Sequence, residues 1–249
     1  MSDSTALAHE APEHGHEAHP AYLRHHFENV EQQADAAGFA MWLFLLTEVM
    51  FFGGLFTAYL IYRNWYYPAF VAASHQLSIP LGGFNTLLLI TSSFTMAMGV
   101  WCAETRRKSG LVLCLVLTLI LGLGFLGVKT VEYGEKIEKH HVPGFHYSID
   151  SFTHPDLNNS ATAKDKPLAL DMARHTEVYF SLYFAMTGMH ALHMIIGIGI
   201  LGFMIYRAQA GAYTNGHVTF VENFGLYWHF VDIVWIFLFP LLYLISRHS

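Results

Sequence analysis

Tyr227-Trp228-His229-Phe230-Val231-Asp232-Ile233-Val234-Trp235 lies inside a long apolar segment, residues 224–246. A helix of this length crosses a bilayer, because each residue adds about 1.5 Å and the hydrocarbon core is about 30 Å thick. His229 and Asp232 are one helical turn apart and therefore share a face of that helix. Since hydrocarbon does not solvate polar groups, we expect this face to point into a bundle, where the two side chains pair with each other or with a neighbouring helix.

The composition of the whole chain indicates a membrane protein. Hydrophobic residues make up 53% of the 249 residues and charged residues 13%, and the mean hydropathy is +0.34. This is too apolar for an ordinary soluble domain of the same length. The net charge is −6 and there is no basic block, which excludes nucleic acid as a partner. Cys102 and Cys114 lie in or beside apolar segments and do not form a disulfide framework of the secreted type.

The hydropathy pattern predicts an all-α fold, a polytopic membrane bundle of five transmembrane helices. We place the spans at residues 39–62, 81–103, 110–128, 178–206 and 224–246. Residues 1–35 form a polar, histidine-rich N-terminal arm, and residues 36–249 form the membrane domain with an external loop at 129–175.

The connection between the second and third spans sets the predicted orientation. It is short and contains Arg106, Arg107 and Lys108. Because positive residues in short loops remain on the cytoplasmic side, we expect the N-terminus inside and, with five spans, the C-terminus outside.

Glu48 is the one charged residue of the first span and lies near its middle. An ionised carboxylate is disfavoured there, so we expect Glu48 to be neutral or closely partnered. Its role is then either an interhelical hydrogen bond or a proton or lipid contact. Gly53 and Gly54 follow within two turns and predict close helix packing.

His190 and His193 share a face of the fourth span. A bis-histidine haem requires ligands from two facing helices, so His229 would have to supply the second ligand. We prefer polar packing between the fourth and fifth spans. Other histidines, in the arm and at positions 140, 141, 146 and 154, lack the spacing of a metal site, and we predict neither metal ligands nor catalytic residues in this chain.

Several of these stretches together resemble subunit III of the haem-copper cytochrome c oxidases. They cover the chain in order from residue 36 to the C-terminus: Trp42-Leu43-Phe44-Leu45-Leu46-Thr47-Glu48-Val49-Met50-Phe51-Phe52, Phe84-Asn85-Thr86, Val131-Glu132-Tyr133, Thr187-Gly188-Met189-His190-Ala191-Leu192-His193 and Trp228-His229-Phe230-Val231-Asp232-Ile233-Val234-Trp235. The chain is similar to the five-helix bacterial form, which lacks the first two helices of longer members.

The resemblance implies an accessory, non-redox subunit of an enzyme of aerobic respiration. Haem and copper are expected in partner subunits I and II, with cytochrome c or a larger respiratory supercomplex as further partners and the bacterial plasma membrane as the location. The subunit would stabilise subunit I, hold phospholipid and support proton uptake. Candidate lipid-binding or buried polar residues are Glu48, Glu132, His190, His193, Arg207, Glu222, His229 and Asp232. Glu104 and His217 are candidates for a proton-collecting surface.

Alternative functions remain open at this point. Within the family, the chain could serve a quinol oxidase or a nitric oxide reductase-linked homologue. Outside it, the chain could be a haem b-binding anchor that uses His190, His193 and His229, or an ion transporter that uses Glu48 and Asp232. Five unequal spans without inverted-repeat symmetry weaken the transporter hypothesis.

Overall fold

The computed structural model describes residue 27 and residues 29–144, 147–148, 152, 170–213 and 218–245. Their helices, in chain order, are α1 (Val30–Trp65), α2 (Tyr67–Ser74), α3 (Ile79–Glu104), α4 (Lys108–Glu138), α6 (Leu170–Arg174), α7 (Thr176–Gln209) and α8 (Thr219–Tyr243). Five of them are long and apolar enough to cross a membrane. The predicted all-α bundle with five spans is confirmed, although α1 begins before residue 39 and α4 continues past residue 128.

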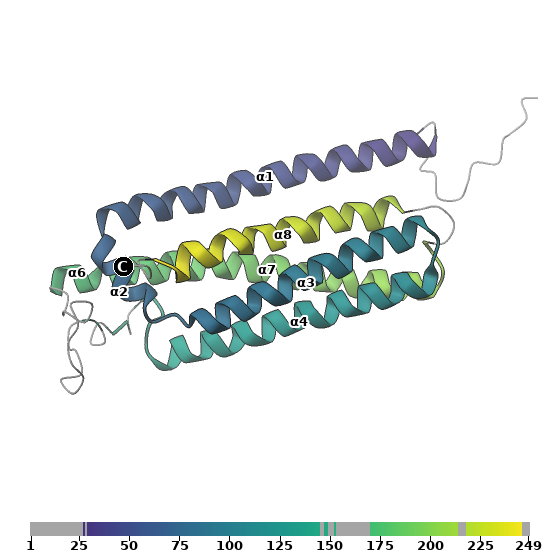
Figure 1. Cartoon of the computed structure of the whole chain (residues 1–249). Helices are drawn as coiled ribbons and strands as arrows, with labels where there is room; N and C mark the ends of the chain where they lie inside the picture. The colour runs from purple at the N-terminus through teal and green to yellow at the C-terminus, as the bar shows by residue number, and fades with distance from the viewer. Residues whose placement is uncertain are drawn as a thin grey trace, which may run out of the picture.

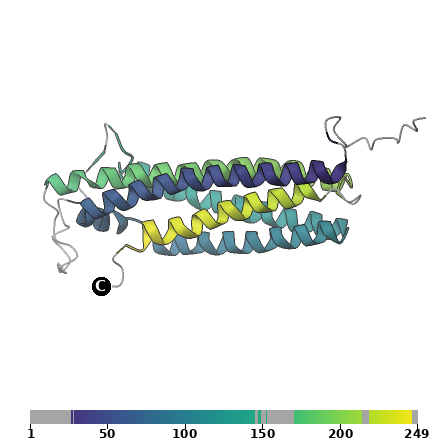
Figure 2. The ribbon, with the colours of Figure 1, turned by 90° about the horizontal axis from the view of Figure 1, so that it is seen from above.

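The five long helices run side by side along one axis (Figure 1). The start of α1, the connection from α3 to α4, the end of α7 and the start of α8 lie at one end of the bundle, which we call the α1-start end (Figure 1). The short helices α2 and α6 and the end of α8 lie at the other end (Figure 1). Seen from above, α1 lies over α7 and α8, whereas α3 is displaced to the opposite side of α8 (Figure 2).

Helix α8 is the most deeply buried of the spanning helices. Half of the residues in its most apolar 18-residue segment are buried, whereas only 11% of the residues in the corresponding segment of α1 are buried. The Trp228 ring on α8 lies between α4 and α7, where an added Cβ at Gly122 or Gly197 would meet the ring at 3.0 Å. Glycine at both positions therefore allows this tryptophan to be buried between three helices.

Two tyrosines tie the end of α8 to its neighbours. The Tyr59 hydroxyl on α1 donates to the Leu241 carbonyl at 2.7 Å, and the Tyr179 hydroxyl on α7 donates to the Leu242 carbonyl at 2.8 Å. The last carbonyls of a helix have no partner within the helix, so these bonds satisfy groups that hydrocarbon would leave unpaired.

Helix α1 leaves most of its apolar surface uncovered. Its buried residues, Leu45, Phe52 and Tyr59, form a single narrow stripe. The predicted close packing at Gly53 and Gly54 is wrong for the described residues, none of which lies within 4 Å of a Cβ added at either position. Both glycines lie on a side of α1 where none of the described helices is a close neighbour.

Candidate functional site: buried polar groups between the helices

Glu48 on α1 and His193 on α7 meet near the middle of their helices. Glu48 Oε2 lies 3.0 Å from His193 Nε2, and the side chains are 18% and 11% exposed. His193 Nδ1 lies 2.8 Å from the Met189 carbonyl oxygen, and since a carbonyl only accepts, Nδ1 carries a proton. The pair is therefore either a protonated Glu48 donating to neutral His193 or a carboxylate accepting from imidazolium. Both forms have zero net charge, which limits the cost of placing them in hydrocarbon.

His190, on the same helix, turns toward α8 instead. Its side chain is fully buried, and Nε2 donates to the Val231 carbonyl at 3.2 Å. This contact joins the fourth and fifth spans, as predicted. The same prediction is wrong for the His193 ring, because Glu48 of the first span contacts it; only the His193 carbonyl contacts α8, accepting from the Tyr227 hydroxyl at 2.8 Å.

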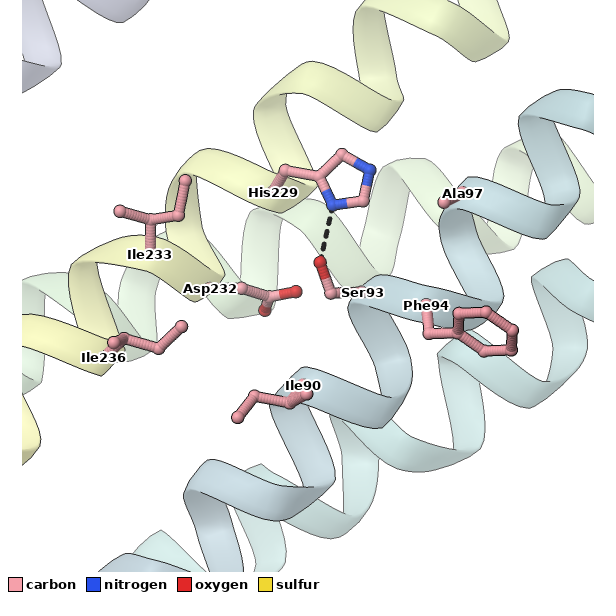
Figure 3. Close-up of a pocket in the computed structure, with 8 residues that line it drawn as sticks. All are labelled: Ile90, Ser93, Phe94, Ala97, His229, Asp232, Ile233 and Ile236. Carbon is pink, nitrogen blue, oxygen red and sulfur yellow. Dashed lines mark hydrogen bonds between the residues drawn. The ribbon is translucent and has the colours of Figure 1, made fainter.

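His229 and Asp232 both face α3, on either side of Ser93 (Figure 3). His229 Nδ1 lies 2.6 Å from Ser93 Oγ. Asp232 is 2% exposed, and neither of its oxygens has a hydrogen-bond partner among the described residues. The interhelical hydrogen bond of Ser93 is to His229. Of the two predicted arrangements, His229 makes the contact with a neighbouring helix, α3, whereas Asp232 is buried beside α3 without a hydrogen bond among the described residues.

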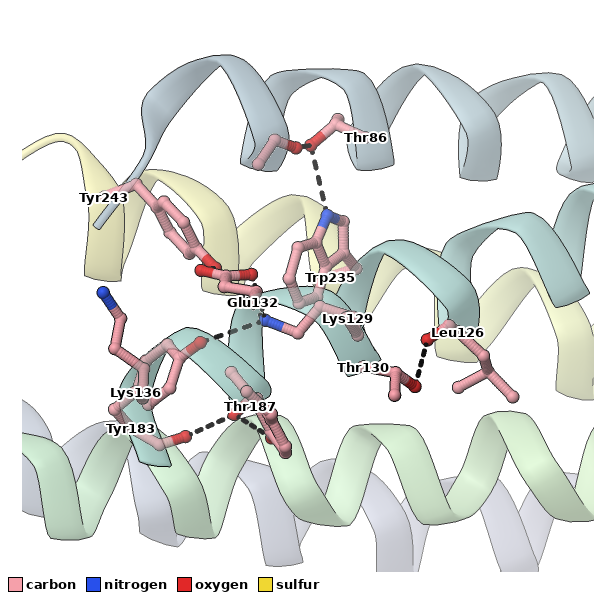
Figure 4. Close-up of polar contacts among 12 residues, drawn as sticks. Thr86, Leu126, Lys129, Thr130, Glu132, Lys136, Tyr183, Thr187, Trp235 and Tyr243 are labelled. Carbon is pink, nitrogen blue, oxygen red and sulfur yellow. Dashed lines mark hydrogen bonds and ion pairs between the residues drawn. The ribbon is translucent and has the colours of Figure 1, made fainter. Parts of the chain in front are cut away.

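A second group of buried charges lies where α4 passes α7 and the end of α8 (Figure 4). Lys129 Nζ donates to Glu132 Oε2 at 2.8 Å and to the Tyr183 and Tyr243 hydroxyls at 3.2 Å each. The Tyr243 hydroxyl donates to Glu132 Oε1 at 2.5 Å. An ammonium has three donors, so every donor of Lys129 is used. We call these four residues the Lys129 cluster.

Sequence analysis found Glu132 but not the other three members of this cluster. Lys129 follows the predicted third span directly and was assigned to the external loop, although α4 continues through it. Lys136 on the same helix is also buried and donates to the Gln76 carbonyl, ahead of α3. The available signal was the Lys129 to Glu132 spacing, which places opposite charges on one helical face directly after an apolar run.

The remaining predicted residues lie near the α1-start end. Glu104 is the exposed last residue of α3, and Glu222 lies, half-buried, in the first turn of α8. Arg207 is exposed in the last turn of α7, where its guanidinium is 5.9 Å from the Phe203 ring centroid. His217 lies outside the described residues.

The three histidines considered for haem contact different neighbours. His190 uses the α8 backbone, His193 uses Glu48 and His229 uses Ser93. Within the described ranges, no group of three His, Cys, Asp or Glu residues is arranged to hold a metal ion. The histidines therefore do not fit the bis-histidine arrangement that a haem would require.

Comparison with known proteins agrees with the motif resemblance. The family model described as cytochrome c oxidase subunit III matches residues 171–247. The cytochrome c oxidase subunit 3 of Synechocystis sp. is 32% identical over 234 residues, which are 93% of this chain and 79% of that protein. The chain belongs to the cytochrome c oxidase subunit III family. A probable cytochrome c oxidase subunit 3 of Nocardia farcinica is 31% identical over 82% of this chain and 85% of its own length.

Several of the buried polar residues lie in the part of the chain that matches the subunit III family model. The part that matches the family model contains His190, His193, His229 and Asp232. These residues make interhelical contacts or, for Asp232, face a neighbouring helix without a bond. These four residues therefore lie between helices of the chain rather than on its lipid-facing surface.

Proposed function

We propose that this subunit III family chain is the accessory, non-redox subunit of a haem-copper terminal oxidase, which oxidises cytochrome c, reduces oxygen and pumps protons. The observation that carries the proposal is the 32% identity over 93% of the chain to a cytochrome c oxidase subunit 3. Haem and copper would reside in subunits I and II. The protein would lie in the bacterial plasma membrane, with residues 36–249 as its membrane domain, the N-terminus and residues 106–108 inside, and the C-terminus and the connection that follows α4 (Lys108–Glu138) outside.

The outward apolar surface supports a bracing role beside a larger subunit. Phe39, Trp42 and Met50 on α1 are 73%, 63% and 72% exposed, and Phe94 on α3 is 65% exposed. Side chains of this size facing outward suit contacts with lipid and with neighbouring transmembrane helices.

Co-purification tests the central proposal. An affinity-tagged chain, extracted in mild detergent, is expected to retain a subunit that carries haem and copper, read from the visible spectrum and from metal analysis. A chain that elutes free of haem and copper, although it is abundant in the membrane, would refute the proposal.

We further propose that phospholipid binds along α1 and α7. Glu48 and His193 provide a partly exposed polar contact at mid-depth, and Arg207 lies fourteen residues further along α7, about 21 Å at the helical rise. That separation suits an acyl chain beside the pair and a phosphate beside the guanidinium. Native mass spectrometry of the complex is expected to show bound phospholipid that is reduced in Arg207→Gln. Equal lipid content in both proteins would contradict this assignment.

Support of proton uptake is the third part of the proposal. Glu104, His217 and the histidines of residues 1–35 would present titratable groups near the inner surface, where they gather protons at high pH. A complex stripped of this subunit is expected to reduce oxygen normally at low pH and more slowly as pH rises. An unchanged pH profile would contradict a role in proton uptake, and bracing of subunit I would then be the remaining role.

A further inference from the structure

A groove of about 420 Å³ opens between α3 and α8 on the outside of the bundle. The two helices are antiparallel, and each contributes one face to the groove (Figure 3). Exposed apolar side chains form its rim, and polar side chains lie deeper. The lining residues are Ile90, Ser93, Phe94, Ala97, His229, Asp232, Ile233 and Ile236.

The Asp232 carboxyl in this groove is buried without a hydrogen-bond partner among the described residues. Asp232 is 2% exposed and points into the groove toward α3 (Figure 3). Neither oxygen has a hydrogen-bond partner among the described residues, and Ser93 Oγ bonds to His229 Nδ1. A buried polar group without a partner is strongly disfavoured, and hydrocarbon offers it neither donor nor acceptor. The described residues therefore leave the Asp232 carboxyl without a hydrogen-bonding partner, which a molecule outside this chain can supply.

The depth of Asp232 in the membrane indicates which kind of molecule can bind in the groove. Asp232 lies near the middle of α8 (Thr219–Tyr243), and Ser93 lies near the middle of α3 (Ile79–Glu104). Phospholipid headgroups lie about 15 Å away, half the thickness of the hydrocarbon core, and acyl chains carry no donor. A transmembrane helix presents hydroxyl, amide or indole donors at that depth.

The surroundings of the groove fit a helix. Large exposed side chains continue along α3 on both sides of it, at helical spacing, and give an apolar stripe over the length of the span: Phe84, Leu87, Ile90, Phe94, Met98 and Trp101. Ser93 and Ala97 are small, which permits close approach of another backbone.

We propose that the α3–α8 groove is the docking site for a transmembrane helix of another oxidase subunit, which places a hydrogen-bond-donating side chain against Asp232. This inference rests on the proposed function, because it requires that the chain be assembled with membrane partners. It adds the surface and the chemistry of the contact.

Photocrosslinking in the intact complex tests the proposal directly. Benzoylphenylalanine at position 94, on the rim, is expected to crosslink to a transmembrane peptide of a different subunit, identified by mass spectrometry. The same probe at Leu113 of α4, which is also exposed, is the matched control and is expected to crosslink to lipid. Crosslinking of position 94 only to lipid, or only to a second copy of this chain, would overturn the proposal.

Substitutions that fill or neutralise the groove give a second measurement. Ala97→Trp fills the groove at an exposed position, whereas Leu113→Trp adds the same ring on α4. We expect Ala97→Trp and Asp232→Leu to lower the ratio of this chain to haem in the purified complex about tenfold, and Asp232→Asn, which still accepts a hydrogen bond, to retain most of it. Equal amounts of each chain in the membrane before extraction exclude a folding defect.

The outcomes separate this inference from the proposed function. Wild-type protein that brings down haem and copper while all the variants remain assembled would overturn the docking site and leave the proposed function intact. Wild-type protein that brings down neither metal would refute both.

Discussion

Glu132 and Asp232 are both almost completely buried carboxyls, 1% and 2% exposed, yet their surroundings are opposite. Glu132 is held by Lys129 at 2.8 Å and by the Tyr243 hydroxyl at 2.5 Å. Asp232 has no hydrogen bond to either oxygen within the described part of the chain. The first belongs to a closed cluster between α4, α7 and α8, and the second lies in an open groove between α3 and α8.

The difference indicates which carboxyl serves the fold and which serves assembly. A closed ion-pair cluster holds helices of the same chain together, so its loss should destabilise this chain itself. The Asp232 carboxyl has no hydrogen bond to lose within the described residues, so its removal should mainly affect the bound state. The predictions below test that distinction.

Removal of the Lys129 ammonium should have the largest effect. Lys129→Met leaves Glu132 buried without its cation, and the expected loss is about 3–5 kcal/mol of folding free energy. Little folded chain should then accumulate in the membrane, as measured by resistance to protease and by thermal unfolding in detergent.

Lys139→Met is the matched control, because Lys139 is exposed at the end of the same helix; its effect should stay within about 0.5 kcal/mol. The double variant Lys129→Met/Glu132→Gln removes both charges and should recover part of the loss. If Lys129→Met and Lys139→Met were equally stable, the cluster would not hold the bundle together.

His141, which follows α4, is a third buried titratable residue and lies outside the spans. It is fully buried, stacks on Phe180 at 5.0 Å, and has no hydrogen bond to its ring nitrogens among the described residues. Burial, together with the nearby charges of Lys136 and Lys139, lowers the pKa of His141 from 6.5 to about 4.

The folded protein therefore binds fewer protons at His141 than the unfolded chain between these two pH values. Stability should fall by up to about 3 kcal/mol as pH drops from 6.5 to 4, with no further loss from this group below pH 4. Unfolding measured across this range in wild type and in His141→Phe should show a flatter profile in the variant. Parallel profiles would mean that other groups set the pH dependence.

The five spans could be predicted from the sequence, but most polar partners could not. Length and hydropathy are sufficient to identify the spans, and the position of Asp232 within one of them is sufficient to predict that its side chain is buried. The partner of Glu48 depends on the rotation of α1 and α7 about their axes. Apolar residues cover nearly every side of α1, so periodicity does not determine that rotation.

The errors at Lys129 and at Gly53 and Gly54 have related causes. Lys129 was assigned to a loop because a charged residue usually marks the end of a transmembrane span. In the structure it lies within α4, and its ammonium is buried next to the Tyr183 and Tyr243 hydroxyls. Gly53 and Gly54 have the small size typical of packing positions, but no residue in the described part of the chain fills the space beside them. A sequence shows residues compatible with an interface but does not specify which chain supplies the other side.

Asp232→Leu should have a small effect on the chain and a larger one on the complex. No hydrogen bond within the described residues is lost, so the stability of the detergent-solubilised chain should change by less than about 1 kcal/mol. Loss of the chain from the complex should still occur. A large drop in stability of the isolated chain would show that Asp232 has an internal partner and would remove its contrast with Glu132.

Glu48→Gln should have the smallest effect, because the glutamine amide can still donate to His193 Nε2 while His193 Nδ1 remains bonded to the Met189 carbonyl. We expect a stability change below about 1 kcal/mol, against about 1–3 kcal/mol for Glu48→Leu, which leaves Nε2 without a partner.

A hydrophobic carbodiimide provides the chemical test of the same residue. The reagent attacks protonated carboxyls from the hydrocarbon, so it should modify Glu48, whose side chain is 18% exposed, before the more deeply buried Asp232 and Glu132. Peptide mapping should locate the adduct at Glu48 in wild type and find none there in Glu48→Gln. Modification of Asp232 ahead of Glu48 would mean that the α3–α8 groove is open to small lipophilic molecules in the assembled enzyme, and a helix docked there would be ruled out by the same experiment.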